Sequence, residues 1–237
     1  MTQAEQKILV ANTAIDNLIE NGKIFSGMKI GLGTGSTALP AVKRLSERIN
    51  DGTIKDIKAV VTSFQTENYC KDLGIPVYTL NDREIGGSLD LTIDGADEID
   101  GNNNLIKGGG AALLLEKIVA YNSKNYVIVA DESKSVNTLG TKFPLPVEII
   151  GAARLSIENE LKKIGASCVL REGTRKCGPV ITDNGNQVID CTWNNPVNPM
   201  ELEDYIKKIP GVVEVGFFTK LKPIAFISHS DGVVEIR

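Results

Sequence analysis

A glycine-rich segment, Gly31-Leu32-Gly33-Thr34-Gly35-Ser36-Thr37, lies between an apolar stretch and a predicted helix. Glycines let the backbone approach a ligand closely, and the free N–H groups at a helix start bind anions. The segment lacks the Gly-Lys pair of a P-loop, and Ser36 replaces the third glycine of the dinucleotide fingerprint. We predict a phosphate site made by Thr34, Gly35, Ser36 and Thr37. A tight turn capped by Ser36 or Thr37 is the alternative.

Acidic side chains follow a second apolar stretch, residues 89–93, in the run Asp94-Gly95-Ala96-Asp97. Open α/β sheets bind ligands at the carboxyl ends of their strands, where Asp94 and Asp97 are expected to lie. An EF-hand loop is excluded because Ala96 stands at a ligand position. The alternative is a solvated acidic turn.

Three consecutive glycines follow a lysine in Lys107-Gly108-Gly109-Gly110, just before a predicted helix over residues 111–121. Glycine runs are entropically costly to order, so their presence indicates backbone that passes close to a ligand. Lys107 adds positive charge there. We predict a second anion-binding element; a flexible loop with a surface lysine is the alternative.

Glu116 lies in that predicted helix, and its neighbours at helical spacing are Ala112, Leu113, Val119 and Ala120. All four are apolar, so we predict that Glu116 projects from a buried face. Burial raises the pKa of a carboxyl, which suits a general base working near neutral pH. The alternative is a glutamate at the edge of the face that reaches water or pairs with a cation.

Histidine and cysteine chemistry is scarce in this sequence. There is one histidine, His229, and the four cysteines form no C-x-x-C pair. This pattern argues against His-cluster metal sites, zinc sites and a disulfide framework. A carboxylate is therefore the expected proton carrier. Lys7 and Lys134 could reach an anion, or could be solvated. His229 is expected to be structural or exposed rather than catalytic, and Trp193 to lie in the core or an interface of the small domain.

The composition is that of an ordinary globular protein, with 42% hydrophobic residues, 24% charged residues and a net charge of −4. The absence of a basic surplus argues against nucleic-acid binding. The polar first residues lack a signal-peptide core, and no apolar run is long enough to span a membrane. We expect a cytoplasmic chain without membrane partners.

Helices and strands that alternate along the first part of the chain must position these residues. Apolar periodicity predicts helices over residues 4–20, 38–49, 65–73 and 111–121. Short apolar runs predict strands over residues 28–32, 58–63, 76–80, 89–93 and 126–130. The alternation favours an α/β fold with an open, mostly parallel sheet covered on both faces.

The pattern changes after Lys142-Phe143-Pro144-Leu145-Pro146, which we interpret as a domain boundary. A strand over residues 147–150, a helix over 154–164 and a strand over 167–170 follow. Next come a hairpin-like stretch with the turn Asp183-Asn184-Gly185-Asn186, a helix over 200–209 and a strand over 212–218. This order is typical of a small ferredoxin-like α+β unit. The tail, residues 224–227 and 233–236, is expected to return to the first sheet. We predict a catalytic domain of residues 1–142 and 220–237, and a small domain of residues 143–219.

The segments GLGTGST, DGADEID, KGGGAALLLEKI, FPLPVEII and VITDNGN, in this order and spacing, resemble ribose-5-phosphate isomerase of the A type. The resemblance runs over nearly the whole chain. It implies a Rossmann-like domain with a smaller α+β domain, and interconversion of D-ribose 5-phosphate and D-ribulose 5-phosphate in the pentose phosphate pathway. It also implies no metal, no organic cofactor, a sugar phosphate as the small-molecule partner, and a homodimer or sometimes a tetramer.

The resemblance also implies a role for each candidate residue. The Thr34–Thr37 loop, with Lys7, would hold the phosphate, and Glu116 would be the base. Asp94 would help to open the furanose ring, and Asp97 would contact sugar hydroxyls. Lys107 and the amides of Gly108, Gly109 and Gly110 would stabilise an oxyanion. Gly95, Ala96 and Lys134 would lie beside the substrate. This chain departs from the pattern at Leu113-Leu114-Leu115, which replaces a more polar run, and at residues 21–28, a longer segment than in some relatives.

Other functions remain open from the residues alone. An amino-sugar-phosphate deaminase or a phosphogluconolactonase would use a similar fold and the same phosphate chemistry. A sugar-phosphate sensor would bind its ligand without turnover. Such regulators often carry an N-terminal DNA-binding module, and the roughly thirty residues before the phosphate loop are too few for one. A CoA transferase would need a nucleophilic glutamate in a longer chain.

Overall fold

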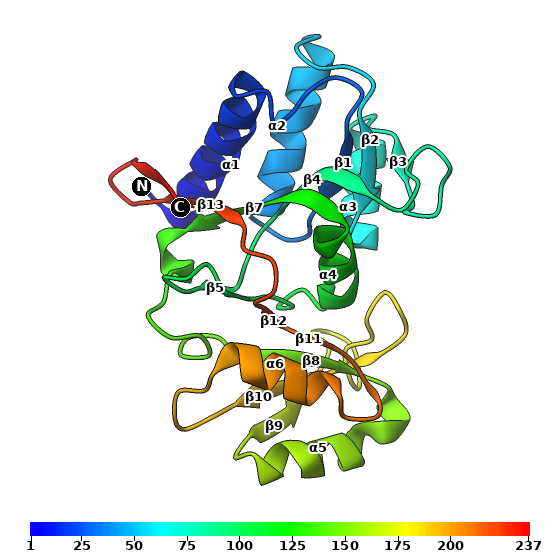
Figure 1. Ribbon diagram of the computed structural model, residues 1–237, viewed down its shortest axis with the longest axis vertical. Helices are drawn as coiled ribbons and strands as arrows, with labels where there is room; N and C mark the ends of the chain where they lie inside the picture. Colours follow the sequence, from blue (N-terminus) through cyan, green and yellow to red (C-terminus); the bar gives the residue numbers. More distant parts are fainter. The chain divides into compact units, whose positions relative to one another are not determined.

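The computed structural model describes residues 1–237, and seven of its strands form one sheet in the order β14-β13-β7-β4-β1-β2-β3 (Figure 1). These strands are β1 (Lys29–Leu32), β2 (Lys58–Val61), β3 (Val77–Tyr78), β4 (Leu89–Asp94), β7 (Ser123–Asp131), β13 (Ile224–Ser228) and β14 (Val234–Ile236). All neighbouring pairs are parallel except β13 with β14. The predicted parallel sheet, and the return of the tail to it, are confirmed.

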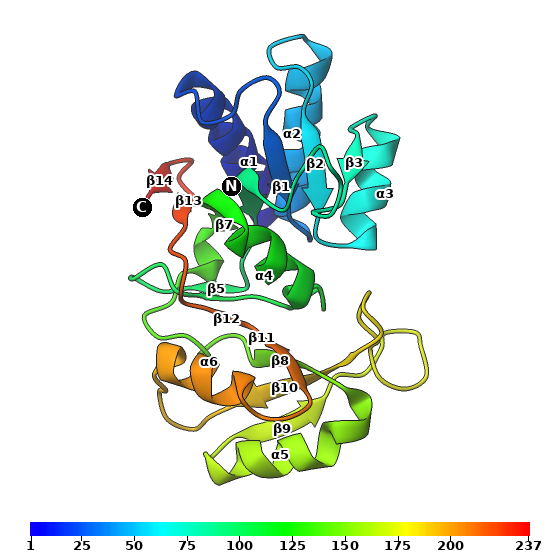
Figure 2. The same cartoon turned by 45° about the vertical axis from the view of Figure 1, so that its right-hand side comes forward.

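Helices cover both faces of this sheet, as predicted. They are α1 (Gln3–Glu20), α2 (Ala38–Asn50), α3 (Phe64–Asp72) and α4 (Leu113–Tyr121). Helices α1 and α2 lie side by side (Figure 2), and their apolar residues share one core with Ile30 of β1 and Ile93 of β4. On the opposite face, Val119 of α4 packs with Val60 and Leu89. Because both faces are buried, the strands are apolar runs rather than alternating ones.

The start of α1 is a capping box. The Thr2 hydroxyl accepts a hydrogen bond from the Glu5 amide at 3.3 Å, and the Glu5 carboxylate accepts one from the Thr2 amide at 2.7 Å. This arrangement satisfies two amides that the first helical turn leaves without partners. It fixes the end of α1 that carries Lys7.

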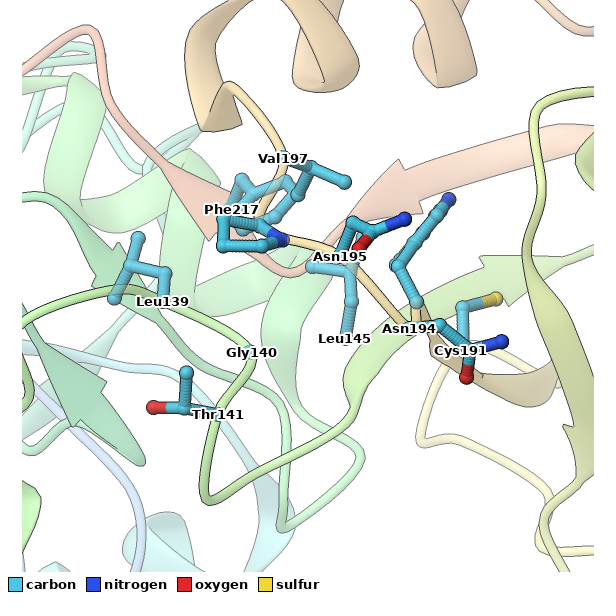
Figure 3. A pocket seen from close by; sticks show the side chains of 11 residues that line it. Leu139, Gly140, Thr141, Leu145, Cys191, Asn194, Asn195, Val197 and Phe217 are labelled. Carbon is cyan, nitrogen blue, oxygen red and sulfur yellow. The ribbon is translucent and has the colours of Figure 1, made fainter.

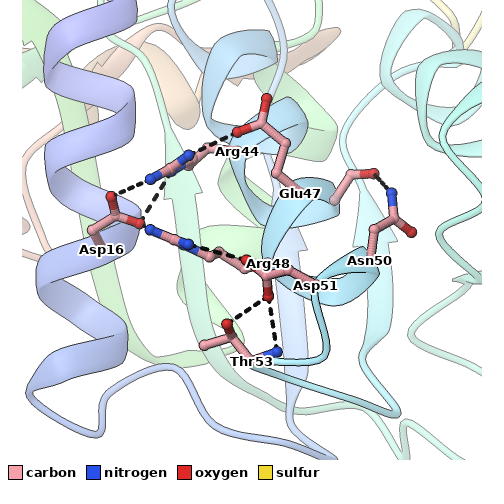
Figure 4. A network of polar contacts seen from close by, with 8 residues as sticks. Asp16, Arg44, Glu47, Arg48, Asn50, Asp51 and Thr53 are labelled. Atoms are coloured by element: carbon pink, nitrogen blue, oxygen red, sulfur yellow. Dashed lines mark hydrogen bonds and ion pairs between the residues drawn. The ribbon is translucent and has the colours of Figure 1, made fainter.

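Two arginines of α2 hold α1 through one carboxylate (Figure 4). Arg44 donates from Nε and Nη2 to the two oxygens of Asp16, at 3.1 and 2.6 Å, and Arg48 donates from Nε at 2.9 Å. Burial alone raises the pKa of Asp16, but these hydrogen bonds outweigh that effect and lower the pKa below the ordinary aspartate value. The network therefore stabilises the folded state when Asp16 is ionised.

Replacing Asp16 with asparagine should lower the free energy of unfolding at pH 7 by about 1 kcal/mol, a value discounted for partial exposure. Because the folded pKa is lowered, the stabilisation is fully present above the ordinary aspartate pKa and is lost as the pH falls through the folded pKa. Urea unfolding at pH 7 and below about pH 4 should show the difference shrinking in acid. An exposed control, Asp72→Asn, should change little at either pH. A difference independent of pH would contradict this account.

A four-stranded antiparallel sheet and two helices make up the smaller α+β part of the fold. It has the order β11-β8-β10-β9 and comprises β8 (Leu145–Ile149), β9 (Ser167–Leu170), β10 (Gln187–Thr192) and β11 (Val212–Val215), with α5 (Arg154–Lys163) and α6 (Pro199–Lys207). Ile157 of α5 and Ile206 of α6 share one core with Ile189 of β10. The chain order and strand order are those of a ferredoxin-like unit, as predicted.

A third, three-stranded sheet was not predicted. It has the order β12-β6-β5 and consists of β5 (Glu98–Ile99), β6 (Leu105–Ile106) and β12 (Phe217–Phe218). The single strand predicted over residues 212–218 is wrong, because Gly216 divides this stretch into two strands, β11 and β12. The Gly216 amide donates to the Pro146 carbonyl at 2.7 Å, and its carbonyl accepts from the Lys107 amide at 2.9 Å. Two short 3₁₀ helices, Glu132–Lys134 and Gly151–Ala153, complete the chain.

Internal contacts group the residues into two units. The first comprises Met1–Gly95, Leu115–Ser133 and Pro223–Arg237, and the second comprises Ala96–Leu114 and Lys134–Lys222. The sequence-based limits, 1–142 with 220–237 and 143–219, remain a prediction; the contacts place residues 96–114 and 134–142 with the second unit. No helix is long and apolar enough to cross a membrane.

Candidate active site

The glycine-rich segment after β1 leads into α2, whose first turn has no side-chain cap. Thr37 is the N-cap residue, but its side chain makes no capping hydrogen bond. Gly35 has a φ of +96°, a conformation that side chains rarely adopt. Nζ of Lys7 on α1 donates to the Ser36 hydroxyl at 2.9 Å. An uncapped helix start beside an ammonium group is suited to an anion.

Hydroxyl groups converge on Thr34 from the end of β2 and the start of α3. Oγ1 of Thr34 lies 2.7 Å from the hydroxyls of both Thr62 and Ser63. The Thr66 hydroxyl donates to the Gly33 carbonyl at 2.8 Å, and the Gly35 amide donates to the Gln65 side chain at 3.2 Å. Sequence reasoning missed these residues. The signal in the sequence was the run Thr62-Ser63 directly after an apolar strand.

Asp94 is fully buried at the end of β4. Its Oδ1 accepts hydrogen bonds from the amides of Thr34, at 3.2 Å, and Gly95, at 2.7 Å. A Cβ atom at Gly33 would lie 1.9 Å from the same oxygen, so only glycine leaves room for this carboxylate. Gly33 of the glycine-rich segment therefore leaves the space that the Asp94 carboxylate occupies.

Glu116 is 5% exposed, so its predicted burial is confirmed. It lies one turn before Val119 on α4. A Cβ atom at Gly31 of β1 would come within 2.5 Å of Val119 and 2.0 Å of Thr92, which shows how closely α4 packs on the sheet. Glycine at position 31 therefore leaves room for Val119 of the helix that carries Glu116. The neighbouring Lys117, 6% exposed, is also buried, which the apolar periodicity did not predict.

Tyr126 of β7 connects the two buried carboxylates electrostatically. Its hydroxyl is buried and makes no hydrogen bond. Burial raises the pKa of Tyr126 well above its usual value, and the charges of Asp94 and Glu116 raise it further. Nothing in the sequence pattern distinguished Tyr126 from an ordinary core residue.

The second unit carries Asp97, Lys107 and the three glycines. The Asp97 carboxylate accepts a hydrogen bond from the Gly109 amide at 2.7 Å, and its own amide donates to the Ile106 carbonyl at 2.8 Å. Lys107 is 2% exposed, and its Nζ lies 5.7 Å from the centre of the Phe218 ring. The alternative of a surface lysine is wrong for Lys107. A buried ammonium held over an aromatic face is a fixed positive charge.

The predicted helix start at residue 111 is wrong. Ala111 has a φ of +57°, which is left-handed backbone, and α4 begins at Leu113. The Ala111 amide donates to the Gly108 carbonyl at 3.0 Å, closing a turn in which Gly108 has a φ of +111°. The glycines therefore form a separate turn before the helix, because a left-handed residue cannot belong to a right-handed helix.

The predicted site residues divide between the two units. The first unit contains Lys7, Thr34, Gly35, Ser36, Thr37, Asp94, Gly95 and Glu116. The second contains Ala96, Asp97, Lys107, Gly108, Gly109, Gly110 and Lys134. Lys134 ends a 3₁₀ helix, half-buried. Glu98, which sequence reasoning did not single out, accepts hydrogen bonds from three backbone amides, those of Gly140, Lys142 and Phe143.

A family model described as ribose 5-phosphate isomerase A (phosphoriboisomerase A) matches residues 58–232 of this chain. A ribose-5-phosphate isomerase A from Treponema denticola is 58% identical over 237 residues, covering 99% of each chain. The chain belongs to the ribose-5-phosphate isomerase A family. Its relatives are isomerases, so the isomerase class read from the sequence motifs is confirmed.

Other ribose-5-phosphate isomerases agree with this assignment. The Treponema pallidum protein is 50% identical over 234 residues, covering 98% of this chain and 92% of its own. The solved structure from Methanocaldococcus jannaschii is 40% identical, with a TM-score of 0.90 over 100% of this chain and 99% of its own. A further solved isomerase, in complex with phospho-erythronic acid, is 39% identical, with a TM-score of 0.93 and the same coverage. The predicted fold class is confirmed.

Several other features contain none of the predicted isomerase residues. A cavity of about 210 Å³ in the second unit (Figure 3) is lined by Cys191, Leu139 and Phe217, and by none of the predicted site residues.

Trp193 donates from Nε1 to the Ile164 carbonyl at 3.0 Å and packs on the core of the small α+β unit, as predicted. His229 lies beside Glu132 and Glu235, at 3.4 and 3.2 Å. No group of three His, Cys, Asp or Glu residues is arranged to hold a metal ion.

Proposed function

We propose that this chain interconverts D-ribose 5-phosphate and D-ribulose 5-phosphate through an enediolate, with Glu116 as the general base. The observation that carries the proposal is a carboxylate buried on α4 in a member of this isomerase family. Glu116 is 5% exposed. A carboxylate in such surroundings exchanges a proton with carbon without competition from bulk water.

The phosphate would be held by the loop Thr34–Thr37 together with Lys7. The uncapped start of α2 and the ammonium of Lys7, 2.9 Å from the Ser36 hydroxyl, support this role. Binding energy from the phosphate, which does not react, orients the sugar at the other end. Gly95, Ala96 and Lys134 are proposed as further contacts of the substrate.

Ring opening precedes the isomerisation, and we assign it to Asp94. Its carboxylate is held by two backbone amides at the end of β4, directly beside the phosphate loop. It would take the proton of the anomeric hydroxyl while the ring oxygen gains one, which yields the open aldehyde. Asp97 would accept hydrogen bonds from sugar hydroxyls.

The isomerisation moves one proton between neighbouring carbons. Glu116 takes the proton from C2, the C–H electrons form the C1–C2 double bond, and the aldehyde oxygen becomes an oxyanion. Lys107 and the amides of Gly108 and Gly110 would stabilise this charge, an effect of about 3–4 kcal/mol per donor. The Gly109 amide, which donates to the Asp97 carboxylate at 2.7 Å, would hold that side chain in place. Glu116 then returns a proton to C1, O2 loses its proton and O1 gains one, which gives the ketose. No step requires a metal or an organic cofactor.

A direct assay of ketose formation from ribose 5-phosphate, with a chelator present, tests the proposal. We expect turnover to be unaffected by the chelator and phospho-erythronic acid to inhibit competitively, because its carboxylate mimics the planar, charged C1–C2 end of the enediolate. Parallel reactions would test for ammonia release from an amino-sugar phosphate and for hydrolysis of a phosphogluconolactone. Either activity without ketose formation would overturn the assignment.

A further inference from the structure

Arg171, which follows β9, contacts the glycine turn of the second unit. Its Nη1 donates to the carbonyl oxygens of Gly108, at 2.7 Å, and Gly109, at 3.2 Å. Its Nε and Nη2 donate to the two oxygens of Asp190 on β10, at 2.8 and 2.5 Å. The side chain is only 15% exposed. All three guanidinium nitrogens are therefore used, and two consecutive loop carbonyls share one donor.

Holding these carbonyls also fixes the direction of two amides. In a planar trans peptide, the carbonyl of one residue and the N–H of the next point to opposite sides. The hydrogen bond to Gly108 therefore orients the Gly109 amide, which donates to Asp97 at 2.7 Å. The hydrogen bond to Gly109 orients the exposed Gly110 amide in the same way.

The turn needs such a restraint. Glycine samples more backbone conformations than any other residue, and three occur in succession here. Ala111 closes the turn in a left-handed conformation, with φ at +57°, which is unfavourable for alanine. The hydrogen bond within the turn, from the Ala111 amide to the Gly108 carbonyl, ends on the same oxygen that Arg171 binds.

Orientation, rather than added charge, is what Arg171 supplies. Asp190 binds its guanidinium in the two-point geometry that arginine and carboxylate favour, so the pair has little net charge. Lysine could not replace it fully, because one ammonium cannot span both Asp190 oxygens and two carbonyls.

We propose that Arg171 is a positioning residue of the isomerase reaction: held by Asp190, it aims the Gly109 amide at the Asp97 carboxylate and the Gly110 amide at the developing oxyanion. The inference rests on the proposed function, in which this turn stabilises the oxyanion. It adds a residue that contacts neither the phosphate loop nor Glu116, and that acts through the backbone of the turn.

The kinetic test compares Arg171→Met and Arg171→Lys with the wild-type protein. For R171M we expect kcat to fall about 10–100-fold, with KM for ribose 5-phosphate within about threefold of wild type. R171K should lie between the two. Guanidinium ion, added below denaturing concentrations, should restore part of the activity of Arg171→Ala. A purely structural role would not produce this separation of kcat from KM, or the rescue.

Two further measurements keep the test decisive. Amide hydrogen exchange of the peptide containing Gly109 and Gly110 should quicken about tenfold in R171M, whatever the turnover. Arg154→Met, which removes an α5 arginine paired with Glu158, should change neither kcat nor this exchange. Unchanged exchange in R171M, or kcat within about twofold of wild type, would overturn the proposal. An inactive wild-type protein would instead overturn the proposed function, and the exchange result would still decide whether Arg171 holds the turn.

Discussion

Replacing Glu116 with glutamine is expected to lower kcat by about 10³–10⁴-fold, because the amide cannot take the C2 proton. The substitution keeps the shape of a side chain that is 5% exposed, so the packing of α4 should be preserved. Affinity for phospho-erythronic acid should be retained, since binding does not require proton transfer. Steady-state kinetics and isothermal calorimetry would measure the two effects separately.

The control for this variant is Glu160→Gln, which replaces a partly exposed glutamate of α5 that pairs with Lys163. It should leave kcat and inhibitor affinity unchanged. A Glu116→Gln protein that keeps near-normal kcat would remove Glu116 from the role of base. Loss of both turnover and inhibitor binding would point instead to a collapsed site.

Replacing Lys107 with methionine should lower kcat by about 10²–10³-fold, because a fixed positive charge near the developing oxyanion is lost. Methionine keeps an apolar chain next to the Phe218 ring, over which the Lys107 ammonium lies at 5.7 Å. Unlike the Glu116 variant, this one should also weaken binding of phospho-erythronic acid, whose carboxylate resembles the oxyanion. Inhibition constants of the two variants, measured side by side, would distinguish the two roles.

Lys124→Met provides the matched control, because this exposed lysine of β7 pairs only with Asp90 at the surface. Its kinetics should match those of the wild type, and thermal unfolding of all variants would show whether they are folded. If Lys107→Met bound the inhibitor normally and lost turnover, Lys107 would act on proton transfer rather than on the oxyanion.

The features predicted from sequence are those that local pattern determines. Apolar runs at residues 28–32, 89–93 and 126–130 predict buried parallel strands, because only a sheet covered on both faces buries such runs. The apolar neighbours of Glu116 at helical spacing predict its burial. The ferredoxin-like order follows from the spacing of elements after residue 146.

The features that sequence reasoning missed depend on contacts between distant segments. Strands β5, β6 and β12 have two residues each, too few for periodicity to register. Arg171 reaches the glycine turn from more than sixty positions away, as the separations of 62 and 63 show. The left-handed Ala111 conflicts with local preference and is imposed by the turn. Such departures from local rules are expected at functional sites.

The most direct test of the central claim is proton NMR of ribose 5-phosphate with the purified protein in D₂O, with a chelator present. The enediolate mechanism predicts that ribulose 5-phosphate forms with deuterium at C1, because the base exchanges its proton with solvent before returning it. The Glu116→Gln protein should show neither product nor exchange on the same timescale. Deuterated ketose formed by the Glu116→Gln protein at the wild-type rate would contradict the role of Glu116 as the base, and no ketose at all from the wild type, despite binding of the sugar phosphate, would contradict the isomerase assignment.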